Sequence, residues 1–480
     1  MQEIFIGAKN GTRCIMDAAM GNRHGVISGA TGSGKTVTLQ VLAEAYSKLG
    51  VPVFLADIKG DLSGLAAASQ PSAKLSQRIA DVGLTDFQAR ANPIIFWDVF
   101  GQSGHPVRST ISDMGPLLLS NLLELNDTQT GVMYSCFKIA DDNGLLLLDL
   151  KDLRAMLTWI GNEASSLQAE YGNIAPASIG AIQRQLLVLE EQGAEHFFGE
   201  PAIALDDFCK TDLSGNGVIN ILDATVLTNK SPRLYASFLL WLLSELFETL
   251  PEVGDADRPK LVLFFDEAHL LFDQAPKVLV DKIEQIVRLI RSKGVGVYFI
   301  SQSPLDIPEN ILGQLGLKIQ HALRAFTPKD QKVVQAVAQT FRKNPKIAAE
   351  TAITELKIGE ALVSVLHADG SPTPVEQVFI CPPAAQIGPI SREQRADLLA
   401  RSPYAGRYDQ LVDRESAYEL LKQRAAQQTA ATASSSTPQK SAARSSGQSI
   451  AEAFLKSAAR SIGSSVGRQI VRGVLGSLLK

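Results

Sequence analysis

A glycine-rich segment restricts the fold of this chain more than any other feature. Residues 29–36 read Gly-Ala-Thr-Gly-Ser-Gly-Lys-Thr, and residues 37–49 repeat apolar side chains at helical spacing up to Gly50. Together with the apolar residues before it, this pattern predicts a strand, a tight loop and a helix in direct succession. The backbone N–H groups of such a loop turn inward around an anion, and the helix adds the positive end of its dipole.

The loop predicts a site for ATP and Mg²⁺. Lys35 would reach the β- and γ-phosphates, and Thr36 would place its hydroxyl on the metal. A short apolar run at residues 51–56 ends in Asp57, which we expect at the same site. The residues predicted to bind the nucleotide are Gly29, Ala30, Thr31, Gly32, Ser33, Gly34, Lys35, Thr36 and Asp57.

Another apolar run, residues 261–265, ends in Asp266 and Glu267. Open α/β sheets bind ligands at the carboxyl ends of their strands. Asp266 is therefore predicted to hold the Mg²⁺ shell, and Glu267 to orient and polarise the attacking water, because phosphoryl transfer chiefly needs positioning and charge neutralisation. An apolar run before Asp-Glu is common by itself, so this prediction depends on the glycine loop beside it.

Further candidates concern the γ-phosphate. Gln302 follows the strand-like run 295–300 and would either report the γ-phosphate or close the strand as a turn residue. An arginine from a neighbouring subunit would suit the spreading phosphate charge. Arg324 is the first choice for this catalytic role and Arg288 and Arg291 are rivals, although each of them could equally be an ordinary surface arginine.

Residues 57–61 read Asp-Ile-Lys-Gly-Asp and are expected to face the same site, with Asp57 as the preferred candidate. Lys59, in the loop after Asp57, is predicted to be solvent-exposed. Residues 61–64 and 212–215 both read Asp-Leu-Ser-Gly, which resembles the signature sequence of transporter ATPases, but neither continues into Gly-Gln. Both segments are therefore predicted to be turns.

Strand-like runs alternate with helical stretches, which favours a doubly wound α/β fold with a mainly parallel sheet. Long amphipathic runs from about residue 110 to 210 predict a helical insertion, and residues 360–366 and 373–380 flank a turn sequence typical of a hairpin. The predicted organisation is a first part of the core at 1–109, the insertion at 110–210, a second part of the core at 211–390, a helical extension at 391–424, a flexible linker at 425–449 and a basic amphipathic helix at 450–480.

Composition limits the partners and the compartment. The net charge of -4 and the pI near 6.0 give no general attraction to nucleic acid, so any DNA contact must come from local basic patches. The four cysteines lie far apart and are predicted to be reduced, mostly buried thiols. Neither a membrane-spanning run nor a secretory signal is evident, so we expect a cytoplasmic protein.

In this order the motifs resemble the HerA/FtsK superfamily of ring-forming DNA-translocating ATPases. The resemblance rests on His24 with the glycine loop, on residues 57–61, on Asp-Glu-Ala-His at 266–269 and on Ser-Gln at 301–302, and it covers residues 1–424. The sequence looks most similar to the YjgR-type HerA-like bacterial ATPases.

Membership would imply a RecA-like core, a homo-oligomer that is a hexamer, ATP hydrolysis at subunit interfaces and movement along duplex DNA through a central channel. Full HerA proteins also carry an N-terminal β-barrel that helps to recruit a nuclease. Fewer than thirty residues precede the glycine loop, which are too few for that barrel. A nuclease partner is therefore doubtful.

The last residues have a helical pattern of their own. From Val466 onward, apolar residues fall on one broad arc at helical spacing and Arg468, Arg472 and Lys480 fall on the other side. Such a helix could contact a membrane, DNA or a protein partner, or could cover the protein's own core. Four glycines lower its helix propensity, so we expect it to become ordered only on contact.

Two functions from different classes follow from the sequence. The leading hypothesis is an ATP-driven motor on duplex DNA. The alternative is a nucleotide-dependent scaffold or regulatory ATPase that binds a protein partner or a membrane through its C-terminal helix, which the acidic pI favours. A small-molecule kinase ranks third, because the acidic pair suits water activation better.

Overall fold

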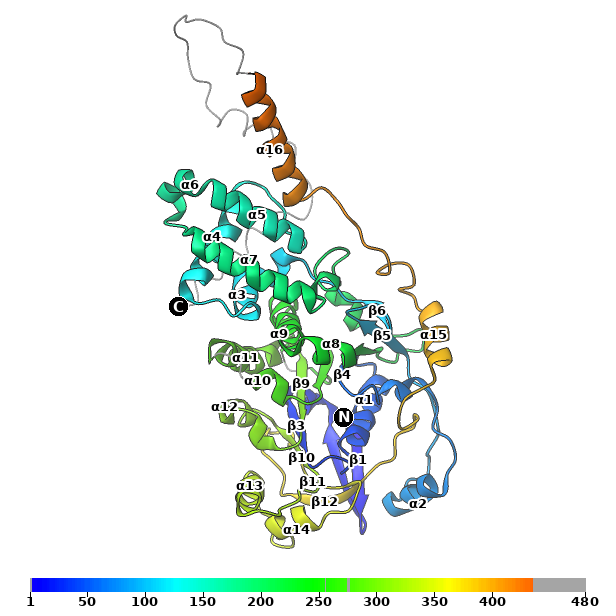
Figure 1. Cartoon of the computed structure of the whole chain (residues 1–480). Coiled ribbons are helices and arrows are strands. Elements are labelled where there is room, and N and C mark those ends of the chain that lie inside the picture. Colours follow the sequence, from blue (N-terminus) through cyan, green and yellow to red (C-terminus); the bar gives the residue numbers. More distant parts are fainter. Residues whose placement is uncertain (1, 255, 274–276, 435–480) are drawn as a thin grey trace, which may run out of the picture. The chain divides into compact units, whose positions relative to one another are not determined.

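The computed structural model describes residues 2–254, 256–273 and 277–434. Met1–Gln423 forms one compact unit, and the second unit, Arg424–Lys480, is described only up to Ser434. Figure 1 follows the first unit through one large sheet and the helices around it.

One mixed sheet contains the strands in the order β2-β1-β12-β11-β10-β3-β9-β8-β4-β7-β5-β6. Neighbouring strands are parallel from β10 to β6 and antiparallel from β2 to β10. The strands are β1 Glu3–Lys9, β2 Thr12–Asp17, β3 Gly25–Ser28, β4 Val53–Asp57, β5 Ile94–Asp98, β6 His105–Pro106, β7 Ile219–Asp223, β8 Leu261–Phe265, β9 Val295–Ser301, β10 Leu317–Gln320, β11 Glu360–Ser364 and β12 Glu376–Ile380.

The parallel part of the sheet confirms the α/β fold that the apolar runs predict. Every residue of β8 and β9 is buried, because helices cover both faces of the sheet. Side chains alternate between the faces, so that Leu263 and Phe265 join one hydrophobic cluster while Val262 and Phe264 join the cluster on the other side.

The antiparallel end of the sheet combines a predicted and an unpredicted hairpin. β11 and β12 pair as the turn sequence predicts. The N-terminal strands β1 and β2 were not predicted, although β1 pairs with β12 and extends the same sheet. A Cβ atom on Gly7 would lie only 2.1 Å from the carbonyl oxygen of Phe379, so glycine is needed where these two strands meet.

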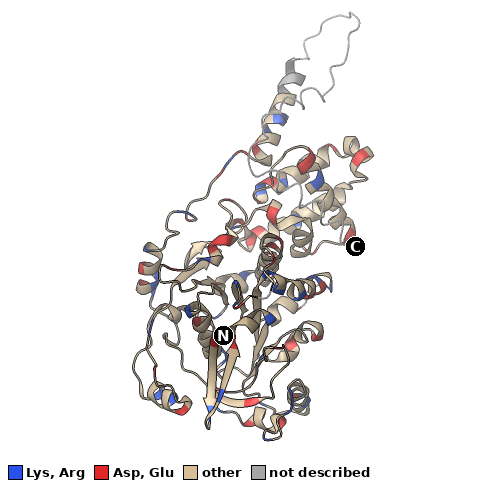
Figure 2. Cartoon of the chain, turned by 180° about the vertical axis from the view of Figure 1, so that it is seen from behind, with Lys and Arg blue, Asp and Glu red and all other residues tan. Residues whose placement is uncertain are grey.

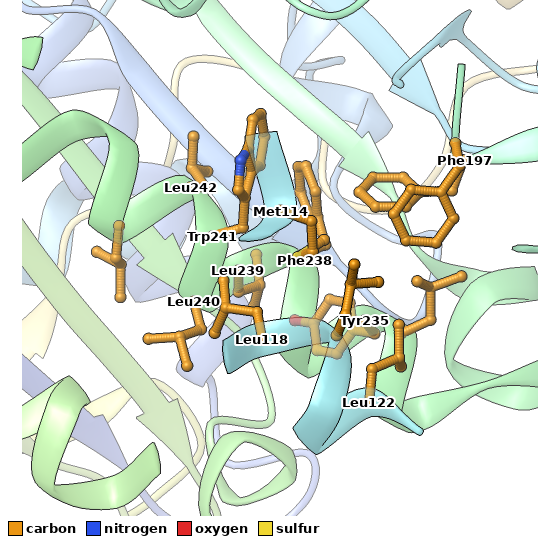
Figure 3. Packing of buried hydrophobic residues seen from close by; sticks show 14 of the residues in the cluster. Met114, Leu118, Leu122, Phe197, Tyr235, Phe238, Leu239, Leu240, Trp241 and Leu242 are labelled. Carbon is orange, nitrogen blue, oxygen red and sulfur yellow. The ribbon is translucent and has the colours of Figure 1, made fainter. Parts of the chain in front are cut away.

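The helices between β6 and β7 occupy the segment predicted as an insertion and belong to the same compact unit as the sheet. Figure 3 shows their junction with the core, where Tyr235 and Phe238 of α9 lie beside Met114 and Leu118 of α3. The helices are α1 Lys35–Lys48, α2 Ala73–Val82, α3 Ile111–Leu122, α4 Asp127–Asp142, α5 Leu150–Asn162, α6 Ala164–Tyr171, α7 Pro176–Glu191, α8 Thr225–Lys230, α9 Pro232–Thr249, α10 His269–Phe272, α11 Lys277–Ile290, α12 Glu309–Leu312, α13 Pro328–Gln339, α14 Ala349–Glu355, α15 Arg392–Ala400 and α16 Ala417–Ser434.

After the hairpin, the chain returns across the sheet. Arg395 of α15 forms an ion pair with Asp223 at 2.6 Å, and its guanidinium lies 4.6 Å from the centre of the Phe96 ring. Helix α16 continues to Ser434, into the first part of the predicted linker, because the Ala and Gln residues there favour a helix. The rest of that linker and the predicted helix at 450–480 lie outside the described residues.

Two expectations from composition can be compared with the described residues. In this part of the chain, no helix combines the length and the apolar character needed to cross a membrane. All four cysteines are free, and Cys209 is the one among them that is partly exposed. Basic and acidic residues are interspersed along the ribbon in Figure 2, in keeping with the small net charge.

Candidate nucleotide site

The predicted site residues come together at one edge of the sheet. The glycine loop follows β3, and residues 57–61 comprise the last residue of β4 and the loop after it. Asp266 follows β8, and Gln302 follows β9. These strands are parallel, so their carboxyl ends meet at the same edge. β9 lies between β3 and β8, which separates the glycine loop from the acidic pair by one strand.

Positive φ angles shape the glycine loop. They are 149° at Gly29, 76° at Gly32 and 119° at Gly34, values that favour glycine over residues with a side chain. Neighbouring segments hold the loop from both sides: the N–H of Ala30 donates to Ala322, and the N–H of Gly359 donates to the carbonyl oxygen of Ser33. The fold therefore fixes a loop whose N–H groups can surround a phosphate, as the sequence predicts.

Lys35 begins helix α1 with a buried side chain. Its Nζ donates to the carbonyl oxygens of Gly29 at 2.5 Å and Ala30 at 3.2 Å. Burial and the nearby charge of Lys59 lower the pKa of Lys35, while the carboxylates of Glu267 and Asp266 act in the opposite direction. The lysine of the glycine loop and the acidic pair therefore share one electrostatic environment.

The acidic pair is buried and lies beside Lys59. The Nζ of Lys59 is 2.6 Å from Oε1 of Glu267 and 4.0 Å from Oδ2 of Asp266. Burial raises the pKa of Asp266 to about 6, against the opposing charge of Lys59. Burial would also raise the pKa of Glu267, but the hydrogen bond and charge of Lys59 outweigh it, so that pKa is lowered. The lowered pKa favours the ionised form of Glu267, which is the stronger hydrogen-bond acceptor for water.

The backbone at Glu267 has an unusual conformation for a residue with a side chain. Its φ angle is 45°, in the left-handed region. Such a conformation persists only when the surrounding structure imposes it, and it is most often found at functional sites. This strain agrees with the catalytic role that the sequence assigns to Glu267.

The loop after β4 contributes more side chains to the site than Asp57, the one preferred from the sequence. Lys59 is 40% exposed, in line with its predicted exposure, yet its ammonium forms an ion pair with the acidic pair. Asp61 was predicted to begin a turn, but its pKa responds to both Lys59 and the hydroxyl of Thr36, with burial as the main cause of its rise. The spacing of Asp57 and Asp61 after one strand was the signal for a second acidic residue at this edge.

The oxygen atoms at this edge fit Mg²⁺. Oδ1 of Asp61 and Oε2 of Glu267 are buried and have no hydrogen-bond partner among the described residues. In the same part of the chain, no group of three His, Cys, Asp or Glu side chains could hold a metal without other ligands. Magnesium usually binds to one or two protein carboxylates together with phosphate oxygens, so Thr36 and Asp266, the predicted metal ligands, would need no further carboxylate beside the nucleotide.

Asp57 has a different environment from the one its prediction implies. Oδ1 accepts from the N–H of Gly60 at 2.7 Å, and Oδ2 accepts from the N–H of Leu62 at 3.1 Å. Burial raises the pKa of this carboxyl to about 7. Both oxygens therefore shape the loop that carries Lys59 and Asp61, and Asp57 would contribute to nucleotide binding through that loop.

Of the remaining candidates, Gln302, Arg324 and Arg288 are exposed, whereas Arg291 is partly buried. Gln302 and Arg324 both lie just beyond strands that flank the glycine loop strand, β9 and β10. Arg288 pairs with Glu284 on α11, and Arg291 follows the same helix.

Two more residues at the site were not found from the sequence. Asp306, which follows β9, acts on the pKa of Lys35. Tyr235 of α9 is fully buried, its hydroxyl has no hydrogen-bond partner among the described residues, and burial together with Asp266, Asp57 and Glu267 raises its pKa. No local motif marks either residue: Asp306 lies in the segment directly after β9, and packing of α9 brings Tyr235 to this edge.

Comparisons with known proteins agree with this arrangement. Residues 3–480 match the family described as Helicase HerA-like C-terminal. The DNA double-strand break repair helicase HerA of Sulfolobus acidocaldarius is 21% identical over 348 residues, which is 71% of this chain and 62% of that protein. The protein of the same name from Saccharolobus solfataricus is 23% identical over 351 residues, 71% of this chain and 61% of that protein. The chain thus spans less than two thirds of the length of these relatives.

Solved structures support the fold. The bacterial conjugative coupling protein TrwBdeltaN70 has a TM-score of 0.52 at 15% identity, over 79% of this chain and 91% of that one. The complex of plasmid coupling protein TrwB with the ATP analogue ADPNP also has a TM-score of 0.52 at 15% identity, over 76% and 89% of the two chains. The core is therefore a RecA-like P-loop fold. Together with the match along nearly the whole length, this shows that the chain belongs to the HerA-like C-terminal helicase family of the HerA/FtsK superfamily.

Proposed function

We propose that this chain is an ATPase that forms a hexameric ring and moves along duplex DNA. The observation that carries the proposal is the convergence of Lys35, Lys59, Asp266 and Glu267 at the edge of the sheet that holds the glycine loop. The names of the HerA relatives, which are repair helicases, support DNA as the substrate. The motor would work in the cytoplasm, where ATP and DNA are both available.

The chemistry follows from the residues at this edge. The N–H groups of the glycine loop and the ammonium of Lys35 would bind the phosphates. Thr36 and Asp266 would hold Mg²⁺, which supplies charge neutralisation when bound. Glu267 would accept a hydrogen bond from the attacking water and so fix the direction of attack.

ATPase measurements with and without duplex DNA test the proposal. We expect hydrolysis that DNA stimulates and that high salt suppresses, because contacts with phosphates release counterions. Lys35→Ala should remove nucleotide binding. Lys48→Ala is the matched control, because Lys48 is an exposed lysine at the other end of the same helix. Hydrolysis that duplex DNA leaves unchanged at every salt concentration would exclude the motor.

Mixing of variants tests the ring. Arg324 of one subunit would complete the site of its neighbour, so Lys35→Ala and Arg324→Ala subunits should each be inactive alone and regain part of the activity when mixed. Arg288→Ala and Arg291→Ala take the place of Arg324→Ala in parallel mixtures. If none of the three arginine variants restores hydrolysis, the arginine acts within its own subunit or does not take part.

A further inference from the structure

Lys59 reaches from the loop after β4 to the acidic pair after β8. Its ammonium is 2.6 Å from Oε1 of Glu267 and 4.0 Å from Oδ2 of Asp266. The side chain of Glu267 is only 9% exposed, whereas that of Lys59 is 40% exposed. The pair therefore joins a buried carboxylate to a lysine that enters the site from solvent.

The two oxygens of Glu267 have different environments. Oε1 accepts from Lys59, while Oε2 is buried without a hydrogen-bond partner among the described residues. His269 lies 3.3 Å from Oε2, but without the geometry of a hydrogen bond. A buried carboxylate oxygen without a hydrogen-bond partner among the described residues is unfavourable, so its retention points to a ligand that hydrogen-bonds to it during function.

We propose that Lys59 is a positioning residue for hydrolysis: it fixes Oε1 of Glu267 and thereby presents Oε2 to the attacking water. The inference rests on the proposed ATPase activity. The left-handed backbone of Glu267 aims the side chain, and the ion pair holds its far end. Lys59 also reduces the repulsion between the neighbouring carboxylates of Asp266 and Glu267.

The opposite role, a restraint that keeps Glu267 from the nucleotide, fits the geometry less well. A restraint would draw the carboxylate away from the glycine loop. Here Glu267 remains close enough to Lys35 to act on its pKa, and the oxygen that water needs is the one that Lys59 leaves without a bond. The two roles also predict opposite changes in rate, so one experiment separates them.

Steady-state kinetics of Lys59→Met and Lys59→Arg provide the first test. We expect kcat to fall about tenfold or more in Lys59→Met, with the KM for ATP within about twofold, because a Glu267 side chain that is no longer held would orient the attacking water less well in the transition state. Lys59→Arg should recover most of the rate, because arginine keeps the charge and the hydrogen bond. Lys9→Met is the matched control: Lys9 forms an ion pair of the same 2.6 Å length with Glu360, away from the acidic pair.

Single-turnover hydrolysis in a Glu267→Gln background provides the second test. If Lys59 acts through Glu267, then Lys59→Met should cause no further loss once Glu267 has been replaced. A merely structural role would instead lower the rate by the same factor in both backgrounds and would overturn the proposal. A higher kcat in Lys59→Met would overturn it as well, in favour of a restraint.

The outcomes also separate this inference from the proposed function. A wild-type protein that hydrolyses ATP, together with a Lys59→Met variant of unchanged kcat, refutes the positioning role alone. A wild-type protein without ATPase activity refutes the proposed function, and the positioning role fails with it.

Discussion

His24 ties the start of the glycine loop strand to the elements around it. Its Nδ1 accepts the N–H of Val297 at 3.0 Å, and its Nε2 lies 2.8 Å from the carbonyl oxygen of Val287. A backbone N–H can only donate, so the ring proton is on Nε2 and the ring is neutral. Burial lowers the pKa of His24 to about 4. The neutral ring thus joins β3 to β9 and α11 in one buried contact.

Replacing this ring by an uncharged amide isolates its contribution. His24→Gln should cost roughly 2–4 kcal/mol of unfolding free energy at pH 7, because the groups on Val287 and Val297 lose their buried partner. The backbone at residue 24 has a φ of 60° and a ψ of 175°, which is unfavourable for any residue with a side chain, so both proteins carry backbone strain at this position.

The pH dependence of the unfolding free energy tests whether the buried ring is neutral. With a folded pKa of about 4, His24 contributes stability that is complete above its unfolded pKa and is lost as the pH falls towards 4. From pH 7 to pH 5 this loss is about 2 kcal/mol in the wild type, given an unfolded pKa near 6.5. The variant lacks the titrating ring. Its deficit relative to the wild type should therefore shrink by that amount.

Urea unfolding of both proteins at pH 7 and pH 5 measures this difference. The other shifted groups, such as Asp57 and Asp266, are present in both proteins and cancel. His367→Gln, on an exposed turn, is the control and should track the wild type at both values of pH. A deficit of His24→Gln that is as large at pH 5 as at pH 7 would refute the reasoning from a neutral buried ring.

Three further predictions concern the site and its support. Glu267→Gln should keep nucleotide affinity but slow single-turnover hydrolysis by about 100-fold or more, since it replaces the charged carboxylate by a neutral amide that polarises water far less; normal turnover would contradict its role. Gly34→Ala should destabilise the loop by about 1–3 kcal/mol and weaken nucleotide binding in a fluorescence titration, because φ is 119° and the new Cβ would lie 3.2 Å from Cα of Gly359. Arg395→Ala should lower the unfolding free energy by about 2 kcal/mol in urea titrations, because it leaves the mostly buried Asp223 without its ion-pair partner. An unchanged value would show that the ion pair adds no net stability.

The strands and their contacts show why the core was predictable. Parallel strands covered on both faces must be apolar throughout, and β8 and β9 stand out in the sequence for that reason. Strands β1 and β2 were not predicted because Gly7 interrupts the apolar residues of β1, and β2 carries Arg13 and Asp17 among its six residues. Their place in the sheet depends on pairing with β12, which is remote in the sequence.

The sequence by itself determined the nucleotide loop, the acidic pair and the parallel core, because each depends on residues that are neighbours along the chain. Only the tertiary structure decided how Lys59 and Tyr235 contribute. Lys59 meets Glu267 because β4 and β8 are adjacent in the sheet. Tyr235 approaches the same carboxylates because α9 packs over that edge. Contacts between segments far apart in the chain have no local signature, so the electrostatics of the site emerged only from the fold.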